Sequence, residues 1–172
     1  ALGEADLESG RAAEIDDPYR IASITKVVTA VVVLRLVEEG QLSLDDTVEE
    51  HLPGLLGERG AEVTVRQLLE HSSGVPEYIG VLAPDPEAAI DLQDEVFETT
   101  ELVDVALEQE WEGEPGSGFF YANTNYAIAG MLAEEVSGRP MPELMAEHVL
   151  EPAGMDATVV PTDAAMPADP LH

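Results

Sequence analysis

The sequence of 172 residues contains no cysteine and only one lysine, Lys26. Without cysteine, the chain cannot form a disulfide, a thiolate metal site or a cysteine nucleophile. Its histidines lack His-Glu-x-x-His spacing, so we expect no metal site, and no other cofactor is indicated. No signal peptide is visible, and the apolar stretch of residues 27–34 is too short to cross a membrane. The sequence therefore predicts no membrane span.

Positive charge is scarce as well, because 36 acidic residues stand against 7 basic ones and give a formal net charge of −29. This charge repels nucleic acids and anionic membranes, so we exclude nucleic acid as a partner. The acidic residues are interleaved with apolar ones along the whole chain, which indicates a solvated surface and not a disordered tail. Adaptation to high salt and a coding bias that depletes lysine both explain this composition.

The apolar fraction of 45% is enough for one core, and the chain is one domain or part of one. Apolar periodicity and capping residues predict a mainly helical chain. The Ser9-Gly10 turn signal within residues 3–14 suggests the end of a hairpin, and residues 157–160 suggest a strand. The helices are expected at residues 23–39 (closed by Gly40), 44–51, 64–69, 99–110, 125–137 (closed by Gly138) and 142–150.

Lys26 follows Ser23 by three positions at the start of the first predicted helix. Residues three apart on a helix are neighbours, so the Ser23 hydroxyl and the Lys26 amine can meet. A lysine amine can lose its proton when desolvated, whereas arginine stays charged. A serine with an adjacent base is an activated nucleophile. This spacing favours nucleophilic catalysis at Ser23.

A structural explanation of the same pair is open. Ser23 can be an N-cap and Lys26 an ordinary charge in the first turn. Two features argue against it. A positive charge in the first turn opposes the helix dipole, and the residues after Lys26 are apolar nearly all round, which is typical of a buried helix.

Several segments agree in order and spacing with one family, from about Asp17 to Met155. The segments are residues 20–26 (RIASITK), 36–46 (LVEEGQLSLDD), 65–76 (VRQLLEHSSGVP), 121–126 (YANTNY) and 151–155 (EPAGM). In these segments the chain resembles the penicillin-recognising serine hydrolases, and more narrowly the branch of class C β-lactamases and serine D-alanyl-D-alanine carboxypeptidases.

This resemblance implies an α/β (α+β) β-lactamase/DD-peptidase-like fold, of which the chain is mainly the helical region with a small remnant of the sheet region. We expect residues 1–22 to be a remnant of the α/β region, 23–160 the helical region and 161–172 a tail that leads to the missing sheet region. The family also implies a secreted or cell-surface location.

Within the family, Ser23 and Lys26 match the first motif, Ser-x-x-Lys, and Tyr121 and Asn123 match the second, Tyr-x-Asn. Residues two apart in extended backbone point the same way, so both can face one cleft. The phenol can relay a proton, and the amide can hold Lys26 or a substrate carbonyl. The alternatives are that Tyr121 packs beside neighbouring aromatic residues in the core and that Asn123 caps a helix.

The resemblance implies two-step acyl transfer in which Ser23 attacks a carbonyl and Lys26 and Tyr121 carry its proton to the leaving group. The Ser23 backbone amide is a candidate for half of an oxyanion hole. The implied substrates are small peptides, β-lactams or esters. Tyr78 is a candidate substrate contact, whereas we expect a structural role for His71.

The chain departs from the family in lacking a third motif, Lys/His-Thr/x-Gly, after Asn123. The His71-Ser-Ser-Gly74 run is one residue too long and precedes the second motif. We therefore expect a fragment that turns over little substrate by itself, either monomeric or associated with the remainder of its own fold. The class A motif Ser-Asp-Asn and the Gly-x-Ser-x-Gly elbow are also absent.

Two classes of function remain after this comparison. The first is a serine acyl-transfer hydrolase, most simply a D-alanyl-D-alanine carboxypeptidase or a β-lactamase-type enzyme, with a small-ester esterase as a variant. The second is a non-catalytic ligand-binding or interaction module that retains the helical half of the fold.

Overall fold

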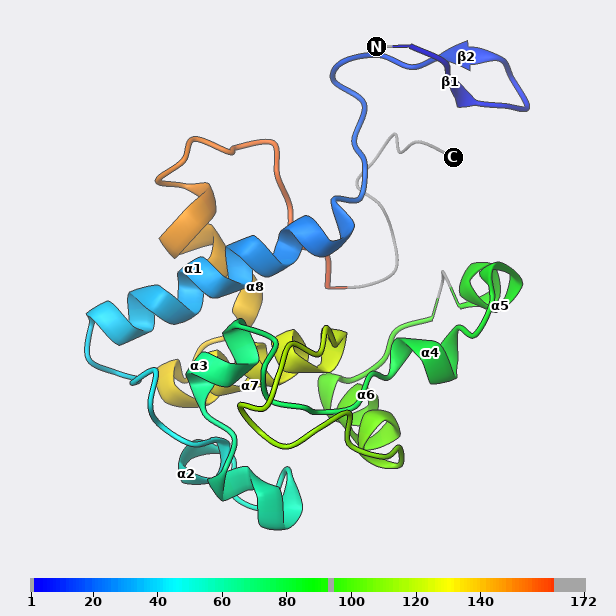
Figure 1. The fold of residues 1–172 in the computed structure, drawn as a ribbon. Helices are drawn as coiled ribbons and strands as arrows, with labels where there is room; N and C mark the ends of the chain where they lie inside the picture. The colour runs from blue at the N-terminus through cyan, green and yellow to red at the C-terminus, as the bar shows by residue number, and fades with distance from the viewer. Residues whose placement is uncertain (1, 93–94, 163–172) are drawn as a thin grey trace.

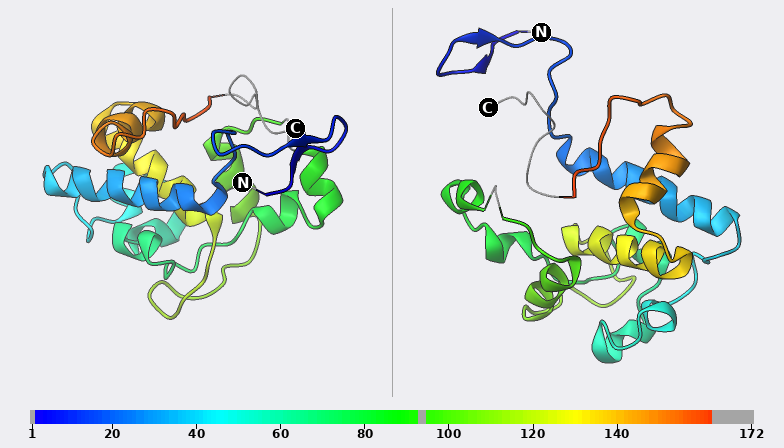
Figure 2. Two further views of the ribbon diagram at one scale, coloured as in Figure 1. Left: turned by 90° about the horizontal axis from the view of Figure 1, so that it is seen from above. Right: turned by 180° about the vertical axis from the view of Figure 1, so that it is seen from behind.

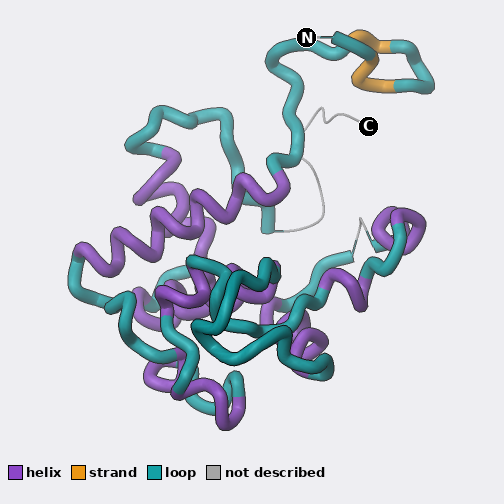
Figure 3. The backbone as a smooth tube through the Cα atoms, in the orientation of Figure 1, coloured by secondary structure: helices purple, strands orange, loops and turns teal. Residues whose placement is uncertain are grey.

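The computed structural model of the protein describes residues 2–92 and 95–162, and these are mainly helical (Figures 1 and 3). Strands β1 (Glu4–Asp6) and β2 (Arg11–Ala12) form a small antiparallel sheet, in which Glu4 pairs with Ala12. The predicted hairpin is therefore confirmed. Figures 1 and 2 show it standing apart from the helices, joined to them by the segment before α1.

Helix α1 (Thr25–Glu38) follows directly on a 3₁₀ turn, η1 (Ala22–Ile24). It ends as predicted, because Gly40 takes a left-handed conformation at φ +73° and Gln41 N–H donates to the Leu36 carbonyl at 2.9 Å. Its first residues differ from expectation. Ile24 occupies the N-cap position, so Ser23 lies within the 3₁₀ turn and does not cap the helix.

Helix α1 buries only one of its faces. The expectation of burial all round is therefore wrong, since Ile24, Val27 and Leu34 are 62%, 63% and 47% exposed. These three residues recur at helical spacing and form one apolar stripe. The described residues lie against the opposite face and leave this stripe open. The buried residues of α1 are Thr29, Val32, Val33 and Leu36.

Helix α7 (Asn123–Ser137) runs through the centre of the fold and packs against α1, α3 (Val65–Leu69) and α6 (Thr99–Leu107). Its residues Ile128 and Leu132 are fully buried in the core. Burying one such side chain contributes about 1.5–3 kcal/mol, so these contacts stabilise the packing of the helices around α7. The helix begins two residues before the predicted start and ends at Gly138, as expected.

The shorter elements follow the predicted order with different bounds. Helix α2 is reduced to Val48–His51, because residues 43–46 form a turn in which Ser43 N–H donates to the Asp46 carboxylate. The predicted strand at 157–160 is wrong, since Thr158 N–H donates to the Met155 carbonyl in a turn. The remaining elements are η2 (Gly57–Ala61), α4 (Ile79–Leu82), α5 (Pro86–Asp91), α8 (Met141–Met145) and η3 (Ala146–Leu150).

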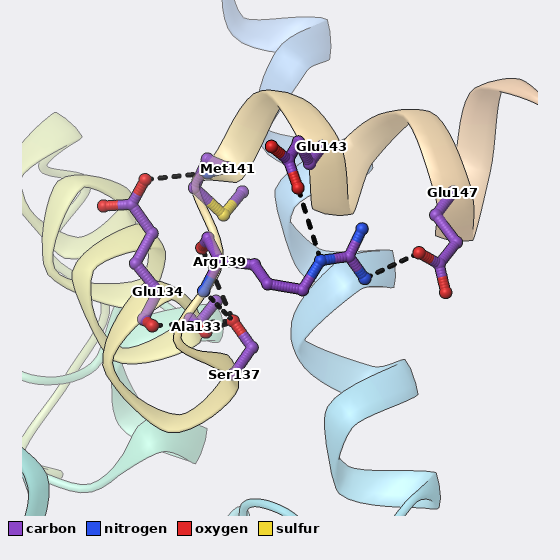
Figure 4. A network of polar contacts seen from close by, with 7 residues as sticks. All are labelled: Ala133, Glu134, Ser137, Arg139, Met141, Glu143 and Glu147. Carbon is purple, nitrogen blue, oxygen red and sulfur yellow. Dashed lines mark hydrogen bonds and ion pairs between the residues drawn. The ribbon is translucent and has the colours of Figure 1, made fainter.

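The connection from α7 to α8 is fixed by polar contacts (Figure 4). Glu134 Oε1 accepts from the backbone N–H of Met141 at 2.7 Å. The Arg139 guanidinium donates to Glu143 at 3.4 Å and to Glu147 at 2.6 Å. These contacts direct α8 and η3 back against α1, with which both are in contact.

Two loops cross the end of α7 that faces the start of α1. The loop of residues 71–78 is tied to the loop of residues 112–122 by backbone hydrogen bonds, including Phe120 N–H to the His71 carbonyl at 2.7 Å. Gly74 has φ +75°, and a Cβ there would clash with the Gly113 carbonyl. Only glycine allows the two loops to approach this closely.

Along the described ranges, no helix is both long and apolar enough to span a bilayer.

Candidate active site

Four polar side chains converge where η1 meets the start of α7. Ser23 Oγ lies 3.1 Å from Lys26 Nζ and 3.1 Å from the Tyr121 hydroxyl. Lys26 Nζ donates to Asn123 Oδ1 at 2.6 Å. The structure thus brings together the four residues of the two sequence motifs, which are about a hundred positions apart along the chain. Every one of these contacts is within hydrogen-bonding distance.

The Ser23–Lys26 contact follows from local geometry, because one turn from η1 into α1 separates the two residues. Ala22, directly before Ser23, has φ +46°. This left-handed conformation costs a residue with a Cβ about 1–2 kcal/mol. Strain of this kind occurs at functional sites, where the surrounding structure maintains it. Ser23 itself is exposed and open to a ligand.

Tyr121 and Asn123 reach the same point because the residue between them is extended. Ala122 has φ −139° and ψ 135°, so the flanking side chains project to the same side. Tyr121 is 49% exposed, and it is therefore not the core aromatic that the alternative explanation required. Asn123 is the first residue of α7, whereas Ala122 occupies the N-cap position. Asn123 is therefore not a helix cap.

The surroundings of the Tyr121 hydroxyl favour its ionised form. The hydrogen bond with Ser23 lowers the pKa of Tyr121, and the adjacent Lys26 amine lowers it further. Lys26 Nζ also lies 5.3 Å from the centre of the Tyr121 ring. A phenol with a lowered pKa is a better proton acceptor near neutral pH than an ordinary tyrosine.

The ring of His71 packs against the ring of Tyr121. The two rings stack with their centroids 4.4 Å apart and their planes at 29°. Burial lowers the pKa of His71, and the charge of Lys26 lowers it further, although Glu77 opposes this effect. His71 Nδ1 is an acceptor for the backbone N–H of Ala122 at 3.3 Å. These contacts agree with the structural role that we expected for His71.

Glu77 also contacts the cluster, and sequence reasoning missed it. Its Oε2 accepts from the backbone N–H and from the side-chain Nδ2 of Asn123, at 2.6 and 2.9 Å. No spacing rule connects positions 77 and 123, so the sequence carries no local signal for this contact.

Tyr78 is partly buried at the end of the loop of residues 71–78, next to Glu77. Its burial raises its pKa, and the charges of Glu77 and Tyr121 raise it further. Tyr78 therefore lies within electrostatic reach of the cluster. Its role as a substrate contact stays a prediction.

Within residues 2–92 and 95–162, no group of three or more histidine or acidic side chains is arranged to hold a metal ion. The cluster described above offers a hydroxyl, an amine, a phenol and an amide. Together they can activate a nucleophile and move a proton.

Comparisons with known proteins identify one family. A family model described as Beta-lactamase matches residues 1–170. "Penicillin-binding protein 4*" from Bacillus subtilis (strain 168) is 29% identical over 162 residues, which cover 93% of this chain and 34% of that protein. The chain thus spans about a third of the length of this curated relative.

Solved structures share the fold. A D-stereospecific amidohydrolase from Streptomyces sp. superposes with a TM-score of 0.81 at 39% identity, over 90% of this chain and 48% of that one. A D-amino acid amidase from Ochrobactrum anthropi SV3 superposes with a TM-score of 0.85 at 29% identity, over 99% of this chain and 46% of that one.

Proposed function

The chain belongs to the beta-lactamase family, and on this basis we propose that it carries the nucleophile and proton-transfer groups of a serine acyl-transfer hydrolase. The observation that supports this most strongly is the position of Ser23 Oγ, 3.1 Å from both Lys26 Nζ and the Tyr121 hydroxyl. A serine hydroxyl in contact with a phenol of lowered pKa and with a lysine amine has beside it the groups that activate a nucleophile. A binding module has no need of this arrangement.

Acylation requires the Ser23 proton to leave as its oxygen attacks. Ser23 Oγ forms a bond to the substrate carbonyl carbon, and its proton passes to Tyr121 as the phenolate or to Lys26 as the free amine, which both touch it. The tetrahedral intermediate then collapses, its bond to the leaving group breaks, and the same two residues return the proton to the leaving amine or alcohol. Water later attacks the ester by the reverse route, which releases the acid and restores Ser23.

Two further groups support these steps. The Ser23 backbone amide is our candidate for one donor of the oxyanion hole. Asn123 accepts from Lys26 at 2.6 Å, which holds the amine beside Ser23. One N–H of Asn123 Nδ2 donates to Glu77, and we propose the other as a donor to a substrate carbonyl. We propose Tyr78 as a contact for the rest of the substrate.

The proposed substrates are D-alanyl peptides and β-lactams, hydrolysed as by serine D-alanyl-D-alanine carboxypeptidases or class C β-lactamases. The similarity to a relative named as a penicillin-binding protein supports this choice. A second candidate is the hydrolysis of D-amino acid amides, which the names of the two superposed structures favour. A small-ester esterase uses the same acyl chemistry and stays a third possibility.

The chain spans 34% of its Bacillus relative, and we propose the hydrolase activity for the whole protein to which this chain belongs. We propose that it acts at the cell surface or outside the cell, in keeping with a relative named as a penicillin-binding protein. Its proposed partners are the substrate and the remainder of its own fold.

Covalent labelling tests the proposal. The natural full-length protein is incubated with a fluorescent penicillin and, separately, with a fluorophosphonate, and the labelled protein is read on a denaturing gel. We expect labelling by at least one reagent, loss of labelling in Ser23→Ala, and retention in the control Ser9→Ala from the hairpin. A non-catalytic module would give no covalent label, and labelling that survives in Ser23→Ala would refute the proposed nucleophile.

A further inference from the structure

Glu77 takes no part in the acyl-transfer steps above, yet both of its carboxylate oxygens are engaged. Oε2 accepts from the backbone N–H of Asn123 at 2.6 Å and from its Nδ2 at 2.9 Å. Oε1 accepts from the backbone N–H of Ile79 at 2.8 Å. The carboxylate is therefore fixed by three donors, two of them from one residue of the site.

These contacts determine which end of the Asn123 amide meets Lys26. An amide offers one acceptor oxygen and one NH₂ donor, on opposite sides of its carbon. Since Nδ2 faces Glu77, Oδ1 faces Lys26 and accepts from Nζ at 2.6 Å. Rotating the amide by half a turn would set its NH₂ against the donors of Lys26 and its oxygen against the carboxylate. Both contacts would become repulsive.

The Glu77 carboxylate is also held in place by the N-terminus of α7. The first N–H groups of a helix lack intrahelical partners, and Asn123 supplies the first of α7. Ala122 at the N-cap has no side-chain acceptor, so Glu77 performs this role from a separate loop. Its negative charge also matches the positive end of the helix dipole. The stability of α7 and the orientation of Asn123 thus depend on the same carboxylate.

We propose that Glu77 is a positioning residue that acts through Asn123 to hold the Lys26 amine within reach of the Ser23 hydroxyl. This inference rests on the proposed function, because it assigns Glu77 a role in acylation. Glu77 need not touch the substrate. Its effect passes from the carboxylate to the amide of Asn123, from the amide to Lys26, and from Lys26 to Ser23.

Two substitutions of similar length test the proposal in the natural full-length protein. Glu77→Gln and Glu77→Met both remove the charge, but only glutamine keeps an acceptor oxygen for Asn123. We expect Glu77→Met to lower the acylation rate constant about 10- to 100-fold, because a small misplacement of a reacting group has this effect. The substrate concentration that gives half-maximal acylation should change little in Glu77→Met. The acylation rate constant of Glu77→Gln should stay within about threefold of the wild-type value. The proposal is overturned if methionine is as fast as wild type or glutamine as slow as methionine.

A double substitution shows whether the effect passes through Asn123. In the Asn123→Ala background, Glu77→Met should cause no further loss of acylation rate, because the amide that it orients is gone. A further loss would contradict the proposed route. The matched control is Glu98→Met, which replaces the residue at the N-cap of α6. This control should leave the acylation rate unchanged.

A spectroscopic measurement separates this proposal from the proposed function. If the wild-type protein fails to acylate, the proposed function fails, and Glu77 is judged by the NMR signals of the Asn123 side-chain NH₂. These signals should shift in Glu77→Met and lie close to the wild-type positions in Glu77→Gln. Signals that stay unmoved in Glu77→Met would overturn the positioning role whatever the activity.

Discussion

The ring of His71 stacks on the ring of Tyr121, with centroids 4.4 Å apart, and its Nδ1 accepts from the backbone N–H of Ala122. A neutral imidazole can accept this hydrogen bond, whereas an imidazolium has a donor on both nitrogens and cannot. The support beneath Tyr121 therefore depends on His71 being neutral. The chain itself favours that form through burial and through the charge of Lys26, which lower the pKa of His71.

This linkage predicts a loss of stability in mild acid. Because the folded-state pKa of His71 lies below the value of 6.5 for a free histidine, the unfolded chain binds a proton at higher pH than the folded chain does. The contribution is full above 6.5 and is lost as the pH falls through the folded-state value. We expect the free energy of unfolding to decline as the pH falls from about 7 to 5, measured by urea denaturation.

The variant His71→Asn isolates this effect. Asparagine offers an acceptor oxygen near the position of Nδ1 and tolerates the left-handed conformation at residue 71, where φ is +56°. It does not titrate, so its unfolding free energy should depend less on pH over the same interval. An unchanged slope in His71→Asn would show that another group is responsible.

Two tyrosines near Lys26 give a matched test of proton transfer. The ring centres of Tyr121 and Tyr126 lie 5.3 and 5.9 Å from Lys26 Nζ, but only Tyr121 contacts Ser23 in the described residues. Tyr126 instead donates to the Leu69 carbonyl at 3.1 Å. Tyr121→Phe should lower the acylation rate constant about 10²- to 10⁴-fold, measured by stopped-flow with a chromogenic substrate.

The Tyr126→Phe control should keep most of its acylation rate. It should lose about 1 kcal/mol of unfolding free energy, because one hydrogen bond is removed. An unchanged acylation rate in Tyr121→Phe would mean that Tyr121 acts through packing and not through its hydroxyl, and an equal loss of rate in Tyr126→Phe would show that the effect is not specific to the hydroxyl that contacts Ser23.

Two glycines with the same backbone conformation test the close approach of the site loops. Gly74 and Gly138 have φ +75° and +68°, so alanine at either position pays the left-handed penalty of about 1–2 kcal/mol. At Gly138 the added Cβ meets no atom within 4 Å, whereas at Gly74 it clashes with the Gly113 carbonyl. Gly74→Ala should therefore lose about 3 kcal/mol or more of unfolding free energy, measured by urea denaturation. Equal losses in the two variants would show that the loops separate without penalty.

The net charge of −29 predicts that salt stabilises the fold. Raising the ionic strength from 0.1 to 1 M shortens the Debye length from about 10 to about 3 Å, which screens repulsion between exposed carboxylates. The melting temperature should rise with potassium chloride over this range, and calorimetry measures it. A flat response would support a coding bias against lysine instead of salt adaptation. Chloride is the suitable salt, because sulfate stabilises most proteins through exclusion from their surface.

The parts of the site that sequence predicted are those fixed by neighbours along the chain. Helical spacing brings Ser23 to Lys26, and the extended Ala122 directs Tyr121 and Asn123 to one side. The helix expected at residues 64–69 is fixed locally as well, because the Thr64 hydroxyl accepts from Gln67 N–H at the start of α3. Each of these contacts spans fewer than five residues, so local stereochemistry determines it.

The parts that sequence did not predict depend on distant contacts. The carboxylate of Glu77 reaches Asn123 across 46 positions, and nothing in its immediate neighbours indicates that contact. The strand expected at 157–160 has the composition of a strand, but a strand forms only where a partner offers backbone groups. The exposed apolar stripe of α1 was not predicted for the same reason. Apolar composition indicates that a side chain favours burial, but it does not indicate which segment covers the helix.

The position of the acyl group after brief exposure to benzylpenicillin tests the role of Ser23 most directly. The natural full-length protein is quenched in acid, its mass is measured intact, and the adduct is located by peptide mapping. One adduct per chain should appear on the peptide that contains Ser23, and it should be absent in Ser23→Ala. An adduct on Lys26 or Tyr121, or an adduct that persists in Ser23→Ala, would contradict nucleophilic catalysis by Ser23.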